Sequence, residues 1–187
     1  KLEKEPGLRI PNMFDAAVEG TFKGIYVQGE DISQSDPNTQ HVQKALGSME
    51  CVVVQDLFLN ETAMWAHVFL PGCSFLEKDG TFTNAERRIN RVRTVLPTKT
   101  GKHEWEVVCE LSTAMGYPMH YDGPAQIMDE IASITPTFAN VSFELLDRVG
   151  SVQWPCNDAA PIGTPIMHVD GFVRGKGMFL ETPYVPT

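Results

Sequence analysis

This 187-residue sequence lacks the marks of several common protein classes. It has no run of 18 apolar residues, so no membrane span is expected. The charged start at residues 1–5 shows no secretory signal, and without an initiator methionine it suits an internal segment or a processed chain. Basic residues are few, 15 against 24 acidic ones, and the net charge of -9 would repel a polyanion. We therefore expect a cytoplasmic protein that binds neither a membrane nor nucleic acid.

Metal-binding and catalytic motifs are also missing. The sequence has four cysteines with no CxxC pair among them, namely Cys51, Cys73, Cys109 and Cys156. Zinc and iron–sulfur sites need closely spaced thiolates, so four reduced thiols are expected. Residues 171–177 resemble a phosphate-binding loop only weakly, because neither Ser nor Thr follows Lys176. No GxGxxG, HExxH or nucleophile–base pair is present. The chain is thus predicted to contain binding features, but no catalytic residue and no metal ligand.

Short apolar runs alternate with helical stretches over the first 70 residues. We predict strands at 22–27, 51–54 and 67–70, and helices at 37–46 and 62–66. Unbroken apolar runs are typical of strands that are covered on both faces, which indicates a parallel sheet. The order is then β-α-β-α-β with right-handed connections. The predicted fold is an α/β three-layer α/β/α sandwich with a mostly parallel, Rossmann-like sheet.

Two local details and the second half of the chain complete this prediction. Asp36 is expected to cap the helix at 37–46, with Pro37 in its first turn. Further helices are expected at 105–115, 127–134 and 143–149. From Ser151 onward the sequence is rich in Gly and Pro. We therefore expect a compact part at 1–150 and an extended segment at 151–187, with short strands at 164–169 and 177–182.

Two acidic segments follow the first two predicted strands. Residues 28–31 are Gln-Gly-Glu-Asp and residues 55–56 are Gln-Asp. In open α/β sheets, ligands bind at the carboxyl ends of the strands, where a glycine lets the backbone approach and carboxylates accept hydrogen bonds. The pattern indicates a nucleoside pocket. Solvated turns and helix caps explain the same residues equally well, so both interpretations stay open.

An arginine-rich stretch at 86–93 follows the small polar residues 80–84. Guanidinium groups match the oxygens of pyrophosphate, so this stretch is a candidate for phosphate binding. A solvated basic segment paired with nearby glutamates is the favoured interpretation. A third hypothesis is that the stretch docks an electron-transfer partner.

An ordered set of motifs resembles a known family. The motifs are GIYVQGED at 24–31, VVVQD at 52–56, NETA at 60–63, FLP at 69–71, EKDGTFTNAERR at 77–88, MGYPMHY at 115–121, QWPC at 153–156 and GKG at 175–177. This set is similar to the molybdopterin oxidoreductases, and within them to formate dehydrogenase catalytic (alpha) subunits of the soluble NAD-dependent type. The resemblance covers essentially the whole chain and implies an internal fragment of such a subunit.

The resemblance implies a cofactor and the residues that hold it. The cofactor is bis-molybdopterin guanine dinucleotide with molybdenum or tungsten, held mainly by the domain at 1–150, while 151–187 leads to the next domain. Glu104 matches a position that is usually Asp and faces guanine. The implied cofactor-binding residues are Gly29, Glu30, Asp31, Ser35, Gln55, Asp56, Gly72 and Glu104.

The resemblance also implies a reaction and partners. The whole subunit would oxidise formate to carbon dioxide, and its metal-ligating residue and [4Fe–4S] cluster would lie outside this chain. Electrons would pass to iron–sulfur and flavin/NAD-binding subunits, and the fragment alone would be inactive. The alternatives are a stand-alone nucleotide-binding or partner-docking domain, or a fragment of another molybdoenzyme such as nitrate reductase.

Overall fold

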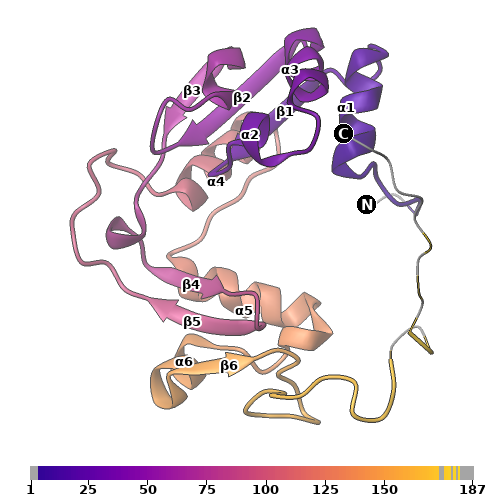
Figure 1. Ribbon diagram of the computed structural model, residues 1–187. Coiled ribbons are helices and arrows are strands. Elements are labelled where there is room, and N and C mark those ends of the chain that lie inside the picture. The colour runs from indigo at the N-terminus through magenta and orange to yellow at the C-terminus, as the bar shows by residue number, and fades with distance from the viewer. Residues whose placement is uncertain (1–3, 173–174, 178, 180, 182–187) are drawn as a thin grey trace. The chain divides into compact units, whose positions relative to one another are not determined.

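The computed structural model describes residues 4–172, 175–177, 179 and 181, and the chain forms two compact units (Figure 1). Unit 1 comprises residues 1–78 and 93–120, and unit 2 comprises residues 79–92 and 121–187. Each unit has its own apolar core. These units have bounds other than the division at residue 150, and the assignment of 1–150 to cofactor binding stays a prediction.

Unit 1 is built on a parallel sheet. Its strands are β1 (Gly24–Gln28), β2 (Cys51–Asp56) and β3 (Val68–Pro71), in the order β1-β2-β3. Gln28 lies opposite Gln55 in the first pair, and Asp56 lies opposite Pro71 in the second. The three carboxyl ends therefore meet at one edge of the sheet. The predicted parallel α/β arrangement is confirmed.

Helices cover the two faces of this sheet. They are α1 (Ile10–Val18), α2 (Ile32–Ser35), α3 (Thr39–Ser48) and α4 (Glu104–Ala114), with short 3-10 helices η1 (Thr62–Trp65) and η2 (Phe75–Glu77). Apolar residues of α1 and α3 pack with Val27, Val52 and Val54 in one buried cluster. Side chains alternate along a strand, so Tyr26 and Gln55 project from the other face, on which α4 lies (Figure 1).

The start of α3 differs from its prediction. Asp36 ends α2 in an extended conformation, and Asn38 occupies the N-cap position of α3 in the left-handed region, with φ 63° and no hydrogen bond from its side chain to the helix. The predicted capping role of Asp36 and the first-turn position of Pro37 are wrong. The reason is that a residue before proline avoids the helical conformation, so the chain must leave one helix before entering the next. The helix predicted at 62–66 is the 3-10 helix η1.

Unit 2 contains an antiparallel sheet that was not predicted. Its elements are β4 (Gly80–Thr83), β5 (Arg88–Val92), α5 (Pro124–Ile134), η3 (Pro136–Phe138), α6 (Phe143–Val149) and β6 (Ser151–Gln153), with strand order β4-β5-β6. Ile89, Leu146 and Val152 lie at the centre of its core. The helices predicted at 105–115, 127–134 and 143–149 correspond to α4, α5 and α6.

Two smaller predictions concern the end of the chain. The strand predicted at 164–169 is wrong, because these residues form bends and irregular structure. The strand predicted at 177–182 includes positions outside the described residues.

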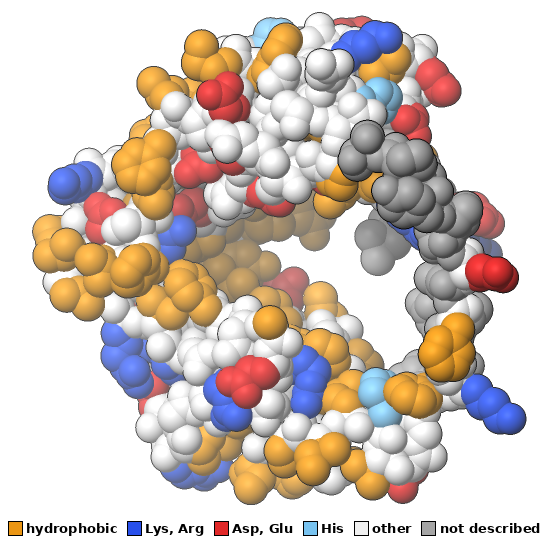
Figure 2. Space-filling view, viewed as in Figure 1, with side chains coloured by type: hydrophobic (Ala, Val, Ile, Leu, Met, Phe, Trp, Pro, Cys, Tyr) orange, Lys and Arg blue, Asp and Glu red, His pale blue; other side chains and the backbone are white. Residues whose placement is uncertain are grey.

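No helix in the described ranges is both long and apolar enough to cross a membrane. Figure 2 shows acidic, basic and apolar side chains interspersed on the visible face.

Candidate functional site

The loops after β1, β2 and β3 are joined by backbone hydrogen bonds at the carboxyl edge of the sheet. The Gly29 N–H donates to the Gln55 carbonyl at 2.9 Å, and the Gly72 N–H donates to the Asp56 carbonyl at 2.9 Å. Gly29 has a φ of 65°, a conformation that favours glycine. The two acidic segments therefore converge, as the sequence predicted from the ends of parallel strands. This result establishes their position and leaves their cofactor role a prediction.

Gln55 forms the buried centre of this edge. The residue is only 1% exposed, and its Oε1 accepts a hydrogen bond from the Tyr26 hydroxyl at 2.5 Å. Burial, and then the charge of Glu104, raise the pKa of the Tyr26 hydroxyl, which keeps it a donor at neutral pH. Tyr26 was missed from the sequence, although strand alternation places it on the same face as Gln55.

Asp31 links the first loop to η1. Its Oδ1 accepts hydrogen bonds from the Thr62 N–H at 3.0 Å and from the Thr62 hydroxyl at 2.6 Å. The same hydroxyl oxygen accepts from the Ser33 N–H at 3.0 Å, and Thr62 is fully buried. Asp31 thus has an evident structural function in fixing the loop after β1. Thr62 is a second residue that was missed from the sequence.

The other carboxylates of the first two loops also shape their own turns. The exposed Glu30 accepts from the Ser35 hydroxyl at 3.2 Å. The half-buried Asp56 accepts from the Leu57 N–H at 2.5 Å through Oδ1 and from Asn60 Nδ2 at 3.0 Å through Oδ2. Both carboxylates keep some exposure at the sheet edge, so they can still accept hydrogen bonds from a ligand.

Gly72 and Glu104 form the third part of the edge. Glu104 is the first residue of α4, and its Oε1 accepts from the Cys73 N–H at 2.8 Å and pairs with Lys78 Nζ at 2.7 Å. A Cβ at Gly72 would lie 3.3 Å from that Oε1 and 3.2 Å from the Asp56 carbonyl carbon. A side chain at Gly72 would therefore crowd both the Asp56 backbone and the Glu104 carboxylate. All three predicted loops and Glu104 lie at one edge.

The arginine-rich stretch belongs to unit 2 and is engaged with protein groups. The Arg87 guanidinium donates to the carbonyls of Trp154, Thr164 and Pro165. Arg91 donates to Asp79 at 2.6 Å, and its guanidinium carbon lies 3.8 Å from the centre of the Phe143 ring. These contacts favour a structural role over pyrophosphate binding or partner docking for these two arginines.

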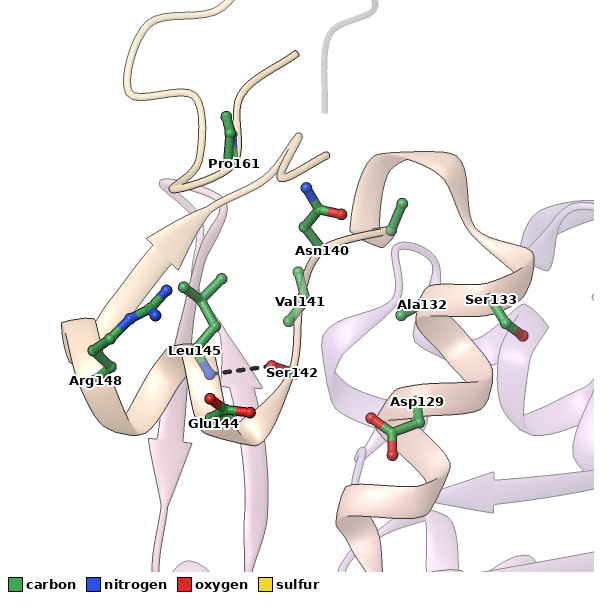
Figure 3. Close-up of a pocket in the computed structure, with 11 residues that line it drawn as sticks. Asp129, Ala132, Ser133, Asn140, Val141, Ser142, Glu144, Leu145, Arg148 and Pro161 are labelled. Carbon is green, nitrogen blue, oxygen red and sulfur yellow. Dashed lines mark hydrogen bonds between the residues drawn. The ribbon is translucent and has the colours of Figure 1, made fainter. Parts of the chain in front are cut away.

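Unit 2 also has a cavity of about 640 Å³ between α5, α6 and the segment before α6 (Figure 3). Asp129, Glu144 and Arg148 lie around it, and Ser142 caps α6 by accepting from the Leu145 N–H at 3.1 Å. No residue predicted from the sequence to bind the cofactor lines this cavity.

Within the described part of the chain, no three His, Cys, Asp or Glu side chains gather as metal ligands.

Glu77 fastens the third loop to the segment that leads to α4. Its carboxylate accepts from the Lys99 N–H at 2.8 Å and from the Ser74 hydroxyl at 2.7 Å and N–H at 2.9 Å. The Lys99 N–H, and then the two Ser74 groups, lower the pKa of Glu77 from 4.5 to about 2. A buried carboxylate with this many donors stabilises the folded chain in its ionised form.

Replacing Glu77 by glutamine should therefore destabilise unit 1 at neutral pH. The folded pKa is depressed, so the stabilising contribution is fully present above pH 4.5 and is lost as the pH falls toward about 2. Urea denaturation of both proteins at several pH values should show a stability gap that shrinks across this window. Ser74→Ala removes one donor, so its stability difference from the wild type should be smaller and should shrink over the same pH range. A gap that does not vary with pH would contradict this assignment.

Comparisons with known proteins show which family the chain belongs to. Residues 1–114, more than half of the chain, match the family described as Molybdopterin oxidoreductase. The chain belongs to the molybdopterin oxidoreductase family, as its motifs predicted. A solved structure, acetylene hydratase from Pelobacter acetylenicus, shares the fold with a TM-score of 0.60 and 21% identity, over 74% of this chain and 20% of that chain.

Several similar curated proteins are named as formate dehydrogenases. The chain is 40% identical over 185 residues to F420-dependent formate dehydrogenase 2 subunit alpha of Methanococcus maripaludis, covering 97% of this chain and 27% of that protein. It is 38% identical over 188 residues to F420-dependent formate dehydrogenase subunit alpha of Methanocaldococcus jannaschii, covering 98% and 28%. It is 42% identical over 175 residues to a putative formate dehydrogenase of Staphylococcus haemolyticus, covering 92% and 18%. The chain thus spans less than a third of the length of these relatives.

Proposed function

We propose that this chain holds one guanosine end of a molybdopterin guanine dinucleotide within the catalytic subunit of a formate dehydrogenase. The observation that carries the proposal is the convergence of the three loops after β1, β2 and β3 at one sheet edge, with Glu104 beside Gly72. When bound, the cofactor supplies the molybdenum or tungsten centre at which formate is oxidised to carbon dioxide. This chain contributes binding groups and no catalytic residue.

The residues at this edge suit the nucleoside part of such a cofactor. Gly29 and Gly72 keep the loops free of side chains that would block a close approach of the ligand to the backbone. The exposed Glu30 and half-buried Asp56 provide acceptors for ribose hydroxyls. Glu104, with its side chain only 10% exposed, provides a fixed carboxylate acceptor for the base of guanosine.

Removing the Asp56 carboxylate should weaken nucleotide binding. We expect the 187-residue chain to bind GDP in preference to ADP, measured by calorimetry. Asp56→Ala should weaken GDP binding by about 5- to 150-fold, since losing an acceptor from a partly desolvated site costs about 1–3 kcal/mol. In the longer protein the same change should lower the molybdenum bound per subunit, measured by mass spectrometry.

A matched control lies at the other end of the same strand. Glu50 precedes β2 at its amino end and pairs only with the exposed Lys23, among contacts to described residues. Glu50→Ala should leave GDP affinity unchanged. Equal affinity in the Asp56 variant would show that Asp56 only shapes its turn. Tighter binding of another nucleotide, with no preference for guanine, would favour a stand-alone nucleotide-binding domain.

The remaining parts of the proposal concern the longer protein. The [4Fe–4S] cluster and the iron–sulfur and flavin/NAD-binding partners implied by the resemblance would lie outside this chain, in the cytoplasm. The acceptor is NAD in this prediction, and coenzyme F420, named in two relatives, is the alternative. In the loop after Asp56, Phe58 and Leu59 are each 74% exposed, which suits a surface covered by the rest of the subunit.

A further inference from the structure

We propose that Lys78 is a positioning residue that leaves Glu104 a single acceptor oxygen, so that the site recognises a purine through its N1–H alone. The inference rests on the proposed function and specifies its base recognition. Its consequence is that the site does not distinguish guanine from hypoxanthine, which has the same N1–H but no exocyclic amino group.

The contacts of Glu104 carry the first step. Both polar contacts from described residues to its carboxylate reach the same oxygen, Oε1: the Cys73 N–H donates a hydrogen bond at 2.8 Å, and Lys78 Nζ forms an ion pair at 2.7 Å. The N–H and the ammonium group together occupy the approach to Oε1. No described residue donates a hydrogen bond to Oε2. The oxygen left for a ligand is therefore Oε2.

The carboxylate is also held in its orientation. Glu104 is buried, with its side chain 10% exposed, while Lys78 is 29% exposed. Its Oε1 lies 3.3 Å from the position that a Cβ would take at Gly72, so the backbone of the third loop packs against this oxygen. Rotation of the carboxylate would break a charge-assisted hydrogen bond and leave Lys78 without its partner. The ion pair thus sets which oxygen a base can reach.

The chemistry of guanine carries the second step. Its N1–H and its exocyclic amino group point in the same direction and match the two oxygens of a free carboxylate. With the approach to Oε1 occupied, only one of these donors can be satisfied by Glu104. The more acidic N1–H forms the stronger bond to a charged oxygen, so it takes Oε2. The exocyclic amino group then adds nothing through Glu104.

Calorimetry of the 187-residue chain with GDP and inosine diphosphate tests the inference. The wild-type affinities should agree within about threefold. Lys78→Met removes the ammonium group from Oε1 and lets the exocyclic amino group approach that oxygen. GDP should then bind at least about tenfold more tightly than inosine diphosphate, the ratio expected of one added hydrogen bond to a charged group. Lys78→Arg keeps the cation and should restore the wild-type ratio.

A control and the contrary outcomes complete the test. Lys102 pairs at 2.6 Å with Glu110 of α4, with both side chains exposed, so Lys102→Met should leave the ratio unchanged. A wild-type preference of tenfold or more for GDP would overturn the inference and leave the proposed function intact. An unchanged ratio in folded Lys78→Met would also overturn it. If that variant does not fold, the wild-type ratio alone decides. No binding of GDP would refute the proposed function, and the inference with it.

Discussion

Replacing Leu46 by alanine is expected to lower the free energy of unfolding of unit 1 by about 2–5 kcal/mol. Leu46 is fully buried on α3, in the cluster that joins α1 and α3 to the sheet. Removing its side chain loses the transfer free energy of the missing carbons. It also leaves a cavity that the rigid strand β2, with Val52 and Val54 fully buried, cannot fill. Urea denaturation followed by circular dichroism measures the loss.

The exposed Lys44 on the same helix provides the control. Lys44→Ala should change stability by less than about 0.5 kcal/mol, because it removes no buried contact. Hydrogen exchange should show that the Leu46 variant opens β1 and β2 more readily and leaves β5 unchanged, since β5 belongs to the other core. A loss below about 1 kcal/mol would mean that α3 contributes little to the core.

The sheet of unit 1 and the place of its ligand edge were predictable from the sequence for one physical reason. Buried parallel strands must be apolar on both faces, so the run at 51–54 is recognisable without knowledge of its neighbours. The chain then leaves each strand at the same edge, which brings Gly29, Asp56 and Gly72 together. Local composition and topology suffice for this inference.

The partners within the site were not predictable in this way. The hydrogen bond from Tyr26 to Gln55 and that from Thr62 to Asp31 each join residues about 30 positions apart. No periodic pattern marks such pairs, because they depend on strand register and on the path of a loop. The role of Lys78 likewise depends on its ion pair with Glu104, which lies on a helix from a later segment.

The hairpin of β4 and β5 was missed because the polar and basic residues of its strands do not indicate that they are buried. The stretch 88–92 has an arginine on each face of the strand, Arg88 on one and Arg91 on the other. This pattern suggests a solvated segment. Arg91 is nevertheless only 8% exposed, since its charge is met by Asp79 and Asp147 and its stem and guanidinium pack on Phe143. An arginine can therefore act as a core residue when carboxylates from distant segments reach it.

Replacing Gly163 by alanine should destabilise unit 2 by about 2–5 kcal/mol. Gly163 has a φ of 96°, and a Cβ there would lie 2.7 Å from the carbonyl oxygen of Gln153, the last residue of β6. The neighbouring Thr164 N–H donates to that same oxygen at 2.8 Å, and the Thr164 carbonyl accepts from Arg87. An added methyl group must push residues 163–164 away from β6, so the strain and the lost hydrogen bonds add.

Gly150 separates these two contributions. It also has a positive φ, 86°, but a Cβ there would meet nothing within 4 Å. Gly150→Ala should therefore show only the backbone strain, about 1–2 kcal/mol, in the same denaturation experiment. Hydrogen exchange at the Thr164 N–H should rise in the Gly163 variant alone. Equal losses in the two variants would mean that the segment around Gly163 does not pack closely on β6, and that Arg87 is held by its contact with Trp154 instead.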